Sequence, residues 1–282
     1  LGLALLFWQT QRIRRRRIGL LISAKLRPTL VPSWSRALQR TKMILLLIAV
    51  SLLFIAIARP QWGTEKKKSH PTGIDILIAL DVSKSMLARD VRPNRLERVK
   101  LGMTNLLDQV QGDRLGLIAF SGTAFLQCPL TLDHHAFSKT LNDLEVGIIK
   151  THGTDLAGPI EEASRSFSKK DRDRFLILLS DGEDLEGEGL KRAKEAKEEG
   201  IRVFTIGIGS PNGSKIPLDP IGQPARNFLK DPQGKTIISR MDEESLRDIA
   251  KATGGQYYSL GPTGEGLAEV LGLLKKIGQQ KK

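Results

Sequence analysis

Four stretches of the chain are mostly apolar, at residues 76–80, 115–120, 175–179 and 201–208. A strand with one face in water alternates apolar and polar side chains, whereas a strand covered by helices on both faces is apolar throughout. These stretches therefore predict buried strands. Two shorter runs, 124–128 and 256–260, predict a strand at the sheet edge and a last strand.

Segments with helical periodicity separate these strands. The clearest one carries Leu96, Val99, Met103, Leu106 and Val110, which fall on one side of a helix. Strands that alternate with helices predict an α/β fold, with a doubly wound, mostly parallel sheet and helices on both faces. We expect this domain to span residues 74–277, with further helices at 133–144, after 153–155, and at 190–199, 242–252 and 265–277.

Residues 209–240 interrupt the alternation, because they are rich in Gly and Pro and follow neither period. Within them, the sequence Asp-Pro-Gln-Gly at 231–234 is typical of a tight turn. We therefore expect a small hairpin inserted between the fifth strand and the next helix.

A different pattern precedes the domain. Residues 43–58 are apolar apart from Ser51, and as a helix these 16 residues would extend roughly 24 Å. Lys42 and Arg59 flank them, and Trp62 suits an interfacial position, so we expect a transmembrane helix. A buried core helix and a cleaved signal sequence ending at 56–58 are the alternatives. The organisation expected around it is a first-helix remnant at 1–8, a basic loop at 9–42, a linker at 59–73 and a tail at 278–282.

The net charge of +13 comes mostly from the basic loop, which holds ten Lys and Arg residues and no acidic residue. Without these ten, 34 basic residues remain against 31 acidic ones, so the rest carries only +3. Aromatic residues are few, which argues against a nucleic-acid-binding surface. The loop predicts a cytoplasmic side before residue 43 and an external domain after residue 58. The single cysteine, Cys128, excludes an internal disulfide.

Candidate chemistry gathers at predicted strand ends. Asp81, Ser83 and Ser85 follow the first strand, Thr154 lies where a helix begins, and Asp181 follows the fourth strand. Ligands of open parallel sheets bind beyond the carboxyl ends of the strands. Oxygen donors there suit a cation such as Mg²⁺, with Mn²⁺ as a second possibility. The alternative is that Asp and Ser only cap helices in this loop.

With these five residues in this order, residues 74–277 resemble the von Willebrand factor A domain. Its metal-ion-dependent adhesion site combines a D-x-S-x-S loop with a distant Thr and a later Asp. The chain further resembles the bacterial BatA/BatB aerotolerance proteins, BatB more closely, at residues 81–91, 93–96, 112–114 and 129–131. This resemblance implies an inner-membrane protein with a periplasmic domain, partners among related Bat membrane proteins, and a link to a MoxR-type ATPase.

The donor set predicts binding rather than catalysis. Two carboxylates and three hydroxyls leave a bound cation short of negative charge, so a carboxylate from a partner protein can complete its coordination. A metal-dependent phosphotransferase or hydrolase is the alternative, and it would need a nucleophile or base beside the metal. The sequence places no His or Cys there, and a dinucleotide motif starting at Gly207 fails because Asn212 stands where its third Gly belongs.

Overall fold

The computed structural model describes residues 9, 10, 12, 13, 16, 17, 36–58, 73–107, 110, 112–151, 153–167, 172–184 and 187–280. Predictions for residues 1–8, for most of the basic loop, for the linker at 59–72 and for residues 281–282 lie outside this part of the chain. The chain divides into two compact units, Leu1–Lys68 and Ser69–Lys282.

The first unit contains the long helix α3 (Arg36–Ala58), which begins before the expected residue 43. Its 23 residues rise about 34 Å, enough for a hydrocarbon core of about 30 Å. Residues Arg40–Ala58 have a mean hydropathy of 2.5, and 0% of this stretch is buried. By length and composition, the helix is therefore able to cross a membrane.

The second unit is built on a six-stranded sheet with the order β3-β2-β1-β4-β5-β8. All neighbours pair in parallel except β2 and β3, which are antiparallel. The predicted doubly wound, mostly parallel sheet is thus confirmed, with the antiparallel strand at its edge. The strands are β1 (Asp75–Asp81), β2 (Arg114–Phe120), β3 (Ala124–Thr131), β4 (Arg174–Ser180), β5 (Ile201–Gly207) and β8 (Tyr257–Ser259).

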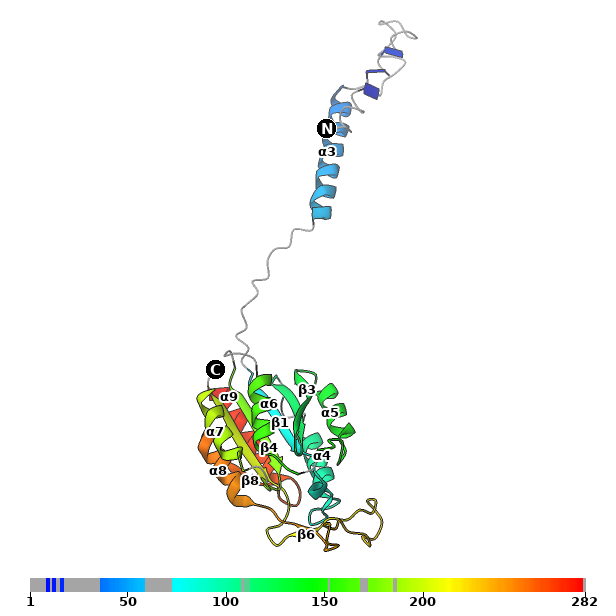
Figure 1. Cartoon of the computed structure of the whole chain (residues 1–282). Coiled ribbons are helices and arrows are strands. Elements are labelled where there is room, and N and C mark those ends of the chain that lie inside the picture. Colours follow the sequence, from blue (N-terminus) through cyan, green and yellow to red (C-terminus); the bar gives the residue numbers. More distant parts are fainter. Residues whose placement is uncertain are drawn as a thin grey trace. The chain divides into compact units, whose positions relative to one another are not determined.

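Helices cover both faces of this sheet (Figure 1). This arrangement explains why residues 76–80 of β1 are apolar throughout. Ile76, Ile78 and Leu80 join the cluster of buried side chains that includes α4, α5 and α9. Leu77 and Ala79 point to the opposite cluster with α6, α7 and α8. The helices are α4 (Arg95–Leu106), α5 (His134–Asp143), α6 (Ala157–Ser166), α7 (Gly189–Glu198), α8 (Glu243–Thr253) and α9 (Glu265–Gln280).

Local sequence sets several helix ends. Asp133 and Asp242 cap α5 and α8, each accepting two backbone N–H groups of the first turn. Gly254 ends α8 with a φ of 80°, a left-handed conformation that glycine adopts without steric cost. These boundaries confirm the predicted start and end of both helices to within two residues.

The stretch 209–240, called the insertion from here on, contains the expected hairpin. Two short strands at the ends of the insertion, β6 (Ser214–Lys215) and β7 (Ile238–Ser239), pair in an antiparallel manner. The hairpin lies between them, where Lys230 and Thr236 form an antiparallel bridge beside the turn at 231–234. At its tip the backbone N–H of Gly234 donates to the carbonyl of Asp231 at 2.9 Å, which closes the turn. The insertion follows β5, so it leaves the sheet at the carboxyl edge, where the candidate site lies.

Candidate metal site

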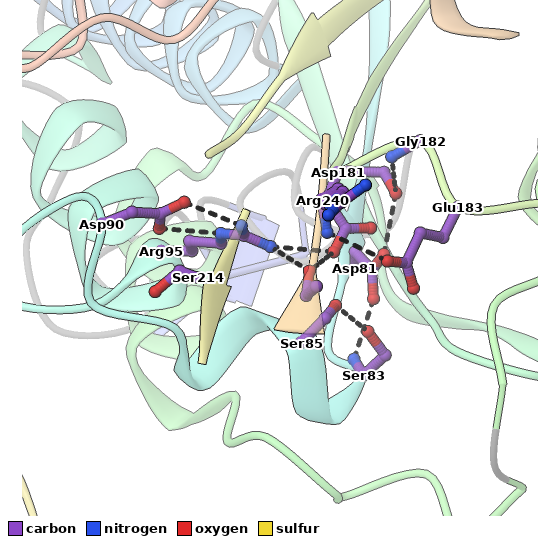
Figure 2. A network of polar contacts seen from close by, with 12 residues as sticks. Asp81, Ser83, Ser85, Asp90, Arg95, Asp181, Gly182, Glu183, Ser214 and Arg240 are labelled. Carbon is purple, nitrogen blue, oxygen red and sulfur yellow. Dashed lines mark hydrogen bonds and ion pairs between the residues drawn. The ribbon is translucent and has the colours of Figure 1, made fainter. Parts of the chain in front are cut away.

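Two carboxylates end neighbouring strands. Asp81 is the last residue of β1, Asp181 directly follows β4, and β1 and β4 are paired in parallel. Both side chains are fully buried. Figure 2 shows them close together within a network of polar contacts. The structure therefore brings together the two predicted acidic residues at the carboxyl edge of the sheet.

Neighbouring groups fix the carboxylate of Asp81. Its Oδ1 accepts the backbone N–H of Ser83 at 2.8 Å, and its Oδ2 accepts the hydroxyl of Ser180 at 2.8 Å. A single 3₁₀ turn, η1 (Lys84–Leu87), follows and carries Ser85. The hydroxyls of Ser83 and Ser85 lie 2.8 Å apart (Figure 2), so the loop presents two adjacent oxygen donors beside Asp81.

Thr154 comes from a different loop but borders the same space. It is buried, and it shares with Ser83 and Ser85 the lining of a cleft of about 780 Å³. Ser121 holds this second loop, because its hydroxyl donates to the carbonyl of Gly153 at 2.8 Å and its own carbonyl accepts the N–H of Asp155 at 2.9 Å. Three hydroxyls predicted as metal ligands thus line one cleft.

The electrostatics of the site disfavour a second negative charge. Burial raises the pKa of Asp81 to about 7, and the charge of Asp181 adds to the shift, although hydrogen bonds from Ser83 and Ser180 oppose it. Burial and the charge of Asp181 also raise the pKa of Glu183, which lines the cleft. A bound cation would remove this electrostatic cost.

This shift predicts a pH dependence for the metal-free protein. The pKa of Asp81 is higher in the folded than in the unfolded chain, so the folded state binds the proton more tightly. The free energy of unfolding should therefore decrease as the pH rises from about 4 to about 7. Urea unfolding is measured in a chelator at each pH for the unmodified chain and for Asp81→Asn. Because Asn does not titrate, the difference between the two proteins isolates the contribution of Asp81. Equal pH dependences in the two proteins would contradict it.

A buried arginine is the residue that the sequence analysis missed. The guanidinium of Arg95, the first residue of α4, is fully buried, and Figure 2 shows it between Asp90 and Asp181. Its Nη1 donates to Asp181 Oδ2 at 2.9 Å and to the hydroxyl of Ser239 at 2.6 Å, while Nε and Nη2 donate to Asp90 at 3.0 and 2.8 Å. The hydroxyl of Ser239 donates to Asp181 Oδ2 at 2.9 Å. Asp181 is therefore paired with a buried guanidinium in the metal-free protein.

One local signal pointed to Arg95. A cation in the first turn of a helix lies near the positive end of the helix dipole, which is unfavourable unless an anion compensates it. Its position beside Asn94, the N-cap of α4, is thus compatible with an acidic partner nearby. The identity of that partner depended on the fold, because Asp181 is 86 residues away in sequence.

The residues present fit a hard cation. Asp181 Oδ1 is buried and has no hydrogen-bond partner, although Oδ2 of the same carboxylate has two. A buried acceptor without a partner is costly, and a cation or a metal-bound water would satisfy it. Within the described residues, no three His, Cys, Asp or Glu side chains are grouped as metal ligands. Any metal held here must therefore use the hydroxyls as well as the carboxylates, as oxygen-preferring ions do.

Comparison with known proteins agrees with this fold. Residues 76–183 match the family "von Willebrand factor type A domain". The chain is 34% identical to an aerotolerance-related membrane protein of Bacteroides fragilis, with a TM-score of 0.68 over 72% of this chain and 100% of that one. It is 35% identical to BatB of Bacteroides thetaiotaomicron, with a TM-score of 0.65 over 73% and 96% of the two chains.

Two more distant relatives were also found, one that matches nearly the whole length of this chain and one that shares its fold. A UPF0353 protein of Nocardia farcinica is 27% identical across 99% of this chain and 84% of its own. Proximal thread matrix protein 1 of the mussel byssus, solved with a zinc-occupied MIDAS motif, is 18% identical, with a TM-score of 0.50 over 72% of this chain and 47% of that one. At that identity the likeness shows the fold alone.

Proposed function

This chain belongs to the BatB-type aerotolerance-related membrane proteins with a von Willebrand factor A domain, and from that premise we propose that it is a membrane-anchored, metal-dependent protein-binding module. One observation carries the proposal: Asp181 Oδ1 is buried without a partner, next to a cleft lined by three hydroxyls from two loops. Such a site accommodates a cation and leaves space beside it for a group from another protein.

The ligands we assign are Asp81, Ser83, Ser85, Thr154 and Asp181, and the ion we assign is Mg²⁺, with Mn²⁺ as the alternative. The bound ion would supply a positive charge at the base of the cleft, with a coordination position open to a carboxylate. The protein side chains orient the donors: Ser180 and the N–H of Ser83 hold Asp81, and Arg95 and Ser239 hold Asp181. A mussel protein of the same fold was solved with a zinc-occupied MIDAS motif, so a metal site is compatible with this fold.

Binding fits the cleft better than catalysis. A metal-dependent phosphotransferase or hydrolase needs a nucleophile or a general base near the reacting atoms. Among the described residues that line the cleft there is no His or Cys, and Lys84 beside the serines is exposed. The module would therefore act by recognising a partner protein, and we place related Bat membrane proteins first among the candidates.

We also propose the orientation of the chain. The ten basic residues before residue 43 would remain in the cytoplasm of a bacterial cell, and the domain would lie in the periplasm. A cytoplasmic MoxR-type ATPase would then reach only the basic loop. A reporter that is active only in the periplasm should be active when fused after Leu260 and silent when fused within residues 23–35. The reverse pattern would contradict this topology.

The proposed function is tested by isolating partners from membranes. Capture of related membrane proteins by the full chain should weaken in a chelator and recover when Mg²⁺ or Mn²⁺ is added, because the ion completes the contact. Asp81→Ala should lose the captured set, whereas Asp133→Asn, which changes a capping carboxylate on α5, should retain it. An unchanged set with Asp81→Ala would show that the metal site is not the recognition surface.

A further inference from the structure

The insertion forms the second wall of the cleft beside the candidate metal site. Ser83 and Thr154 line this cleft together with Ile216, Leu229 and Ile237 of the insertion. The volume of about 780 Å³ lies within the range of roughly 300–1,000 Å³ that is usual for ligand sites. This space is therefore large enough for several side chains of a partner, beyond the single carboxylate that a metal would take.

Hydrogen bonds fasten the insertion to the elements that carry the candidate ligands. The guanidinium of Arg89, just after η1, donates to the carbonyls of Asp219, Pro220 and Gln223, each at 2.8 Å. At the other end of the insertion, the N–H of Arg240 donates to Glu183 at 3.2 Å (Figure 2). Three carbonyls held by one guanidinium indicate a wall with a defined position relative to the metal-site loops.

The rest of the lining differs in chemistry from the metal-site hydroxyls. Ile216 is buried and Ile237 is 36% exposed, so the insertion offers an apolar surface that is partly open to solvent. Three exposed lysines also line the cleft: Lys84, Lys150 and Lys230.

Two carboxylates line the cleft as well. Asp231 Oδ1 is occupied within the hairpin turn, where it accepts the N–H groups of Gln233 and Lys235 at 3.0 and 2.8 Å. Glu183 accepts the N–H of Arg240 at 3.2 Å. Three lysines against these two carboxylates leave the lining of the cleft with a net positive charge, which suits a negatively charged ligand.

We propose that the insertion determines which partner is bound, and that the cleft takes an extended acidic segment of another protein. This inference rests on the proposed metal-dependent binding. One carboxylate of the segment is directed to the metal, its neighbouring apolar side chains pack on Ile216, Leu229 and Ile237, and a second carboxylate lies near Lys230. Apolar burial supplies affinity and the lysines supply selectivity for acidic segments.

The test is a selection of displayed random dodecapeptides on the full chain in nanodiscs, with Mg²⁺ present and elution by chelator. We expect enriched sequences to contain Asp or Glu beside apolar residues and to lack Lys and Arg. Affinities of an enriched synthetic peptide are then measured for two pairs of variants. Ile237→Ser and Lys230→Glu change the cleft, whereas Ile221→Ser and Lys235→Glu change exposed positions of the same insertion that do not line it.

The dissociation constant should rise about tenfold or more in each cleft variant and less than about twofold in each control. Mg²⁺ binding, measured separately by calorimetry, should be the same in all four variants. If Mg²⁺ binds but no acidic and apolar peptide is enriched, or if cleft and control variants bind the peptide equally, the role of the insertion is refuted while the metal site stands. If Mg²⁺ does not bind to the unmodified chain, the proposed function itself fails.

Discussion

Millimolar Mg²⁺ should raise the melting temperature of the fragment 69–282 by several degrees. An ion that binds only the folded state adds about 2.7 kcal/mol at 100 times its dissociation constant, which corresponds to roughly 5–10 °C for a domain of this size. The gain arises because the cation offsets the repulsion between the buried carboxylates of Asp81 and Asp181. The fragment matches a compact unit of the chain, and the whole solved chain of the B. fragilis relative aligns with 72% of this chain.

Two variants show whether the effect arises at this site. In Asp81→Asn the shift with Mg²⁺ should vanish, while the melting temperature without metal should hold or rise, because one buried charge has been removed. In Asp133→Asn, which leaves the site intact, the full shift should remain. If Asp81 were only a capping residue, neither the unmodified fragment nor the Asp81→Asn variant would respond to Mg²⁺. An equal shift in the unmodified fragment and in Asp81→Asn would place the ion elsewhere.

Loss of the buried guanidinium of Arg95 should have an even larger effect on stability than loss of the metal. Arg95→Met leaves Asp181 and Asp90 without their guanidinium partner, and the side chain of Asp181 is fully buried. Removing one member of a buried ion pair costs about 3–5 kcal/mol, because an uncompensated charge is left in the interior. Urea unfolding in a chelator should show a decrease of this size. Arg165→Met, which removes an ion pair on the exposed surface of α6, should cost less than about 1 kcal/mol.

A double variant separates the charge from simple loss of packing. Adding Asp181→Asn to Arg95→Met removes the unpaired charge, so part of the lost stability should return. If the effects of the two substitutions simply add, Arg95 stabilises the domain by packing and not by compensating Asp181. If Arg95→Met unfolds the fragment at neutral pH, recovery of folding in the double variant gives the same information.

The fold was predictable because its signals are local. The apolar run from Ile76 to Leu80 predicts burial on both faces of the strand. In the structure its alternate side chains pack in two separate buried clusters. The positions of Asp81 and Asp181 followed from the same reasoning, since neighbouring parallel strands end at one edge. Their role as metal ligands stays a prediction, which the experiments above test.

The groups that surround the site could not be predicted in the same way. Ser239 contacts Arg95 across 144 residues, and Arg89 contacts the insertion across about 130. Such pairs leave no periodic pattern, because each partner is a single polar residue in a loop or at an element end. The insertion itself was expected as a hairpin, but only the folded chain shows that Ile237 and Lys230 face the same cleft as Thr154.

The central claim is that Asp81, Ser83, Ser85, Thr154 and Asp181 hold one metal ion. The most direct measurement is anomalous diffraction from crystals of the fragment 69–282 grown with Mn²⁺, which scatters anomalously where Mg²⁺ does not. We expect one strong anomalous peak among the three hydroxyls and the two carboxylates, and no peak there in Asp81→Asn. A peak only at another position, or none in crystals with ample Mn²⁺, would contradict the assignment.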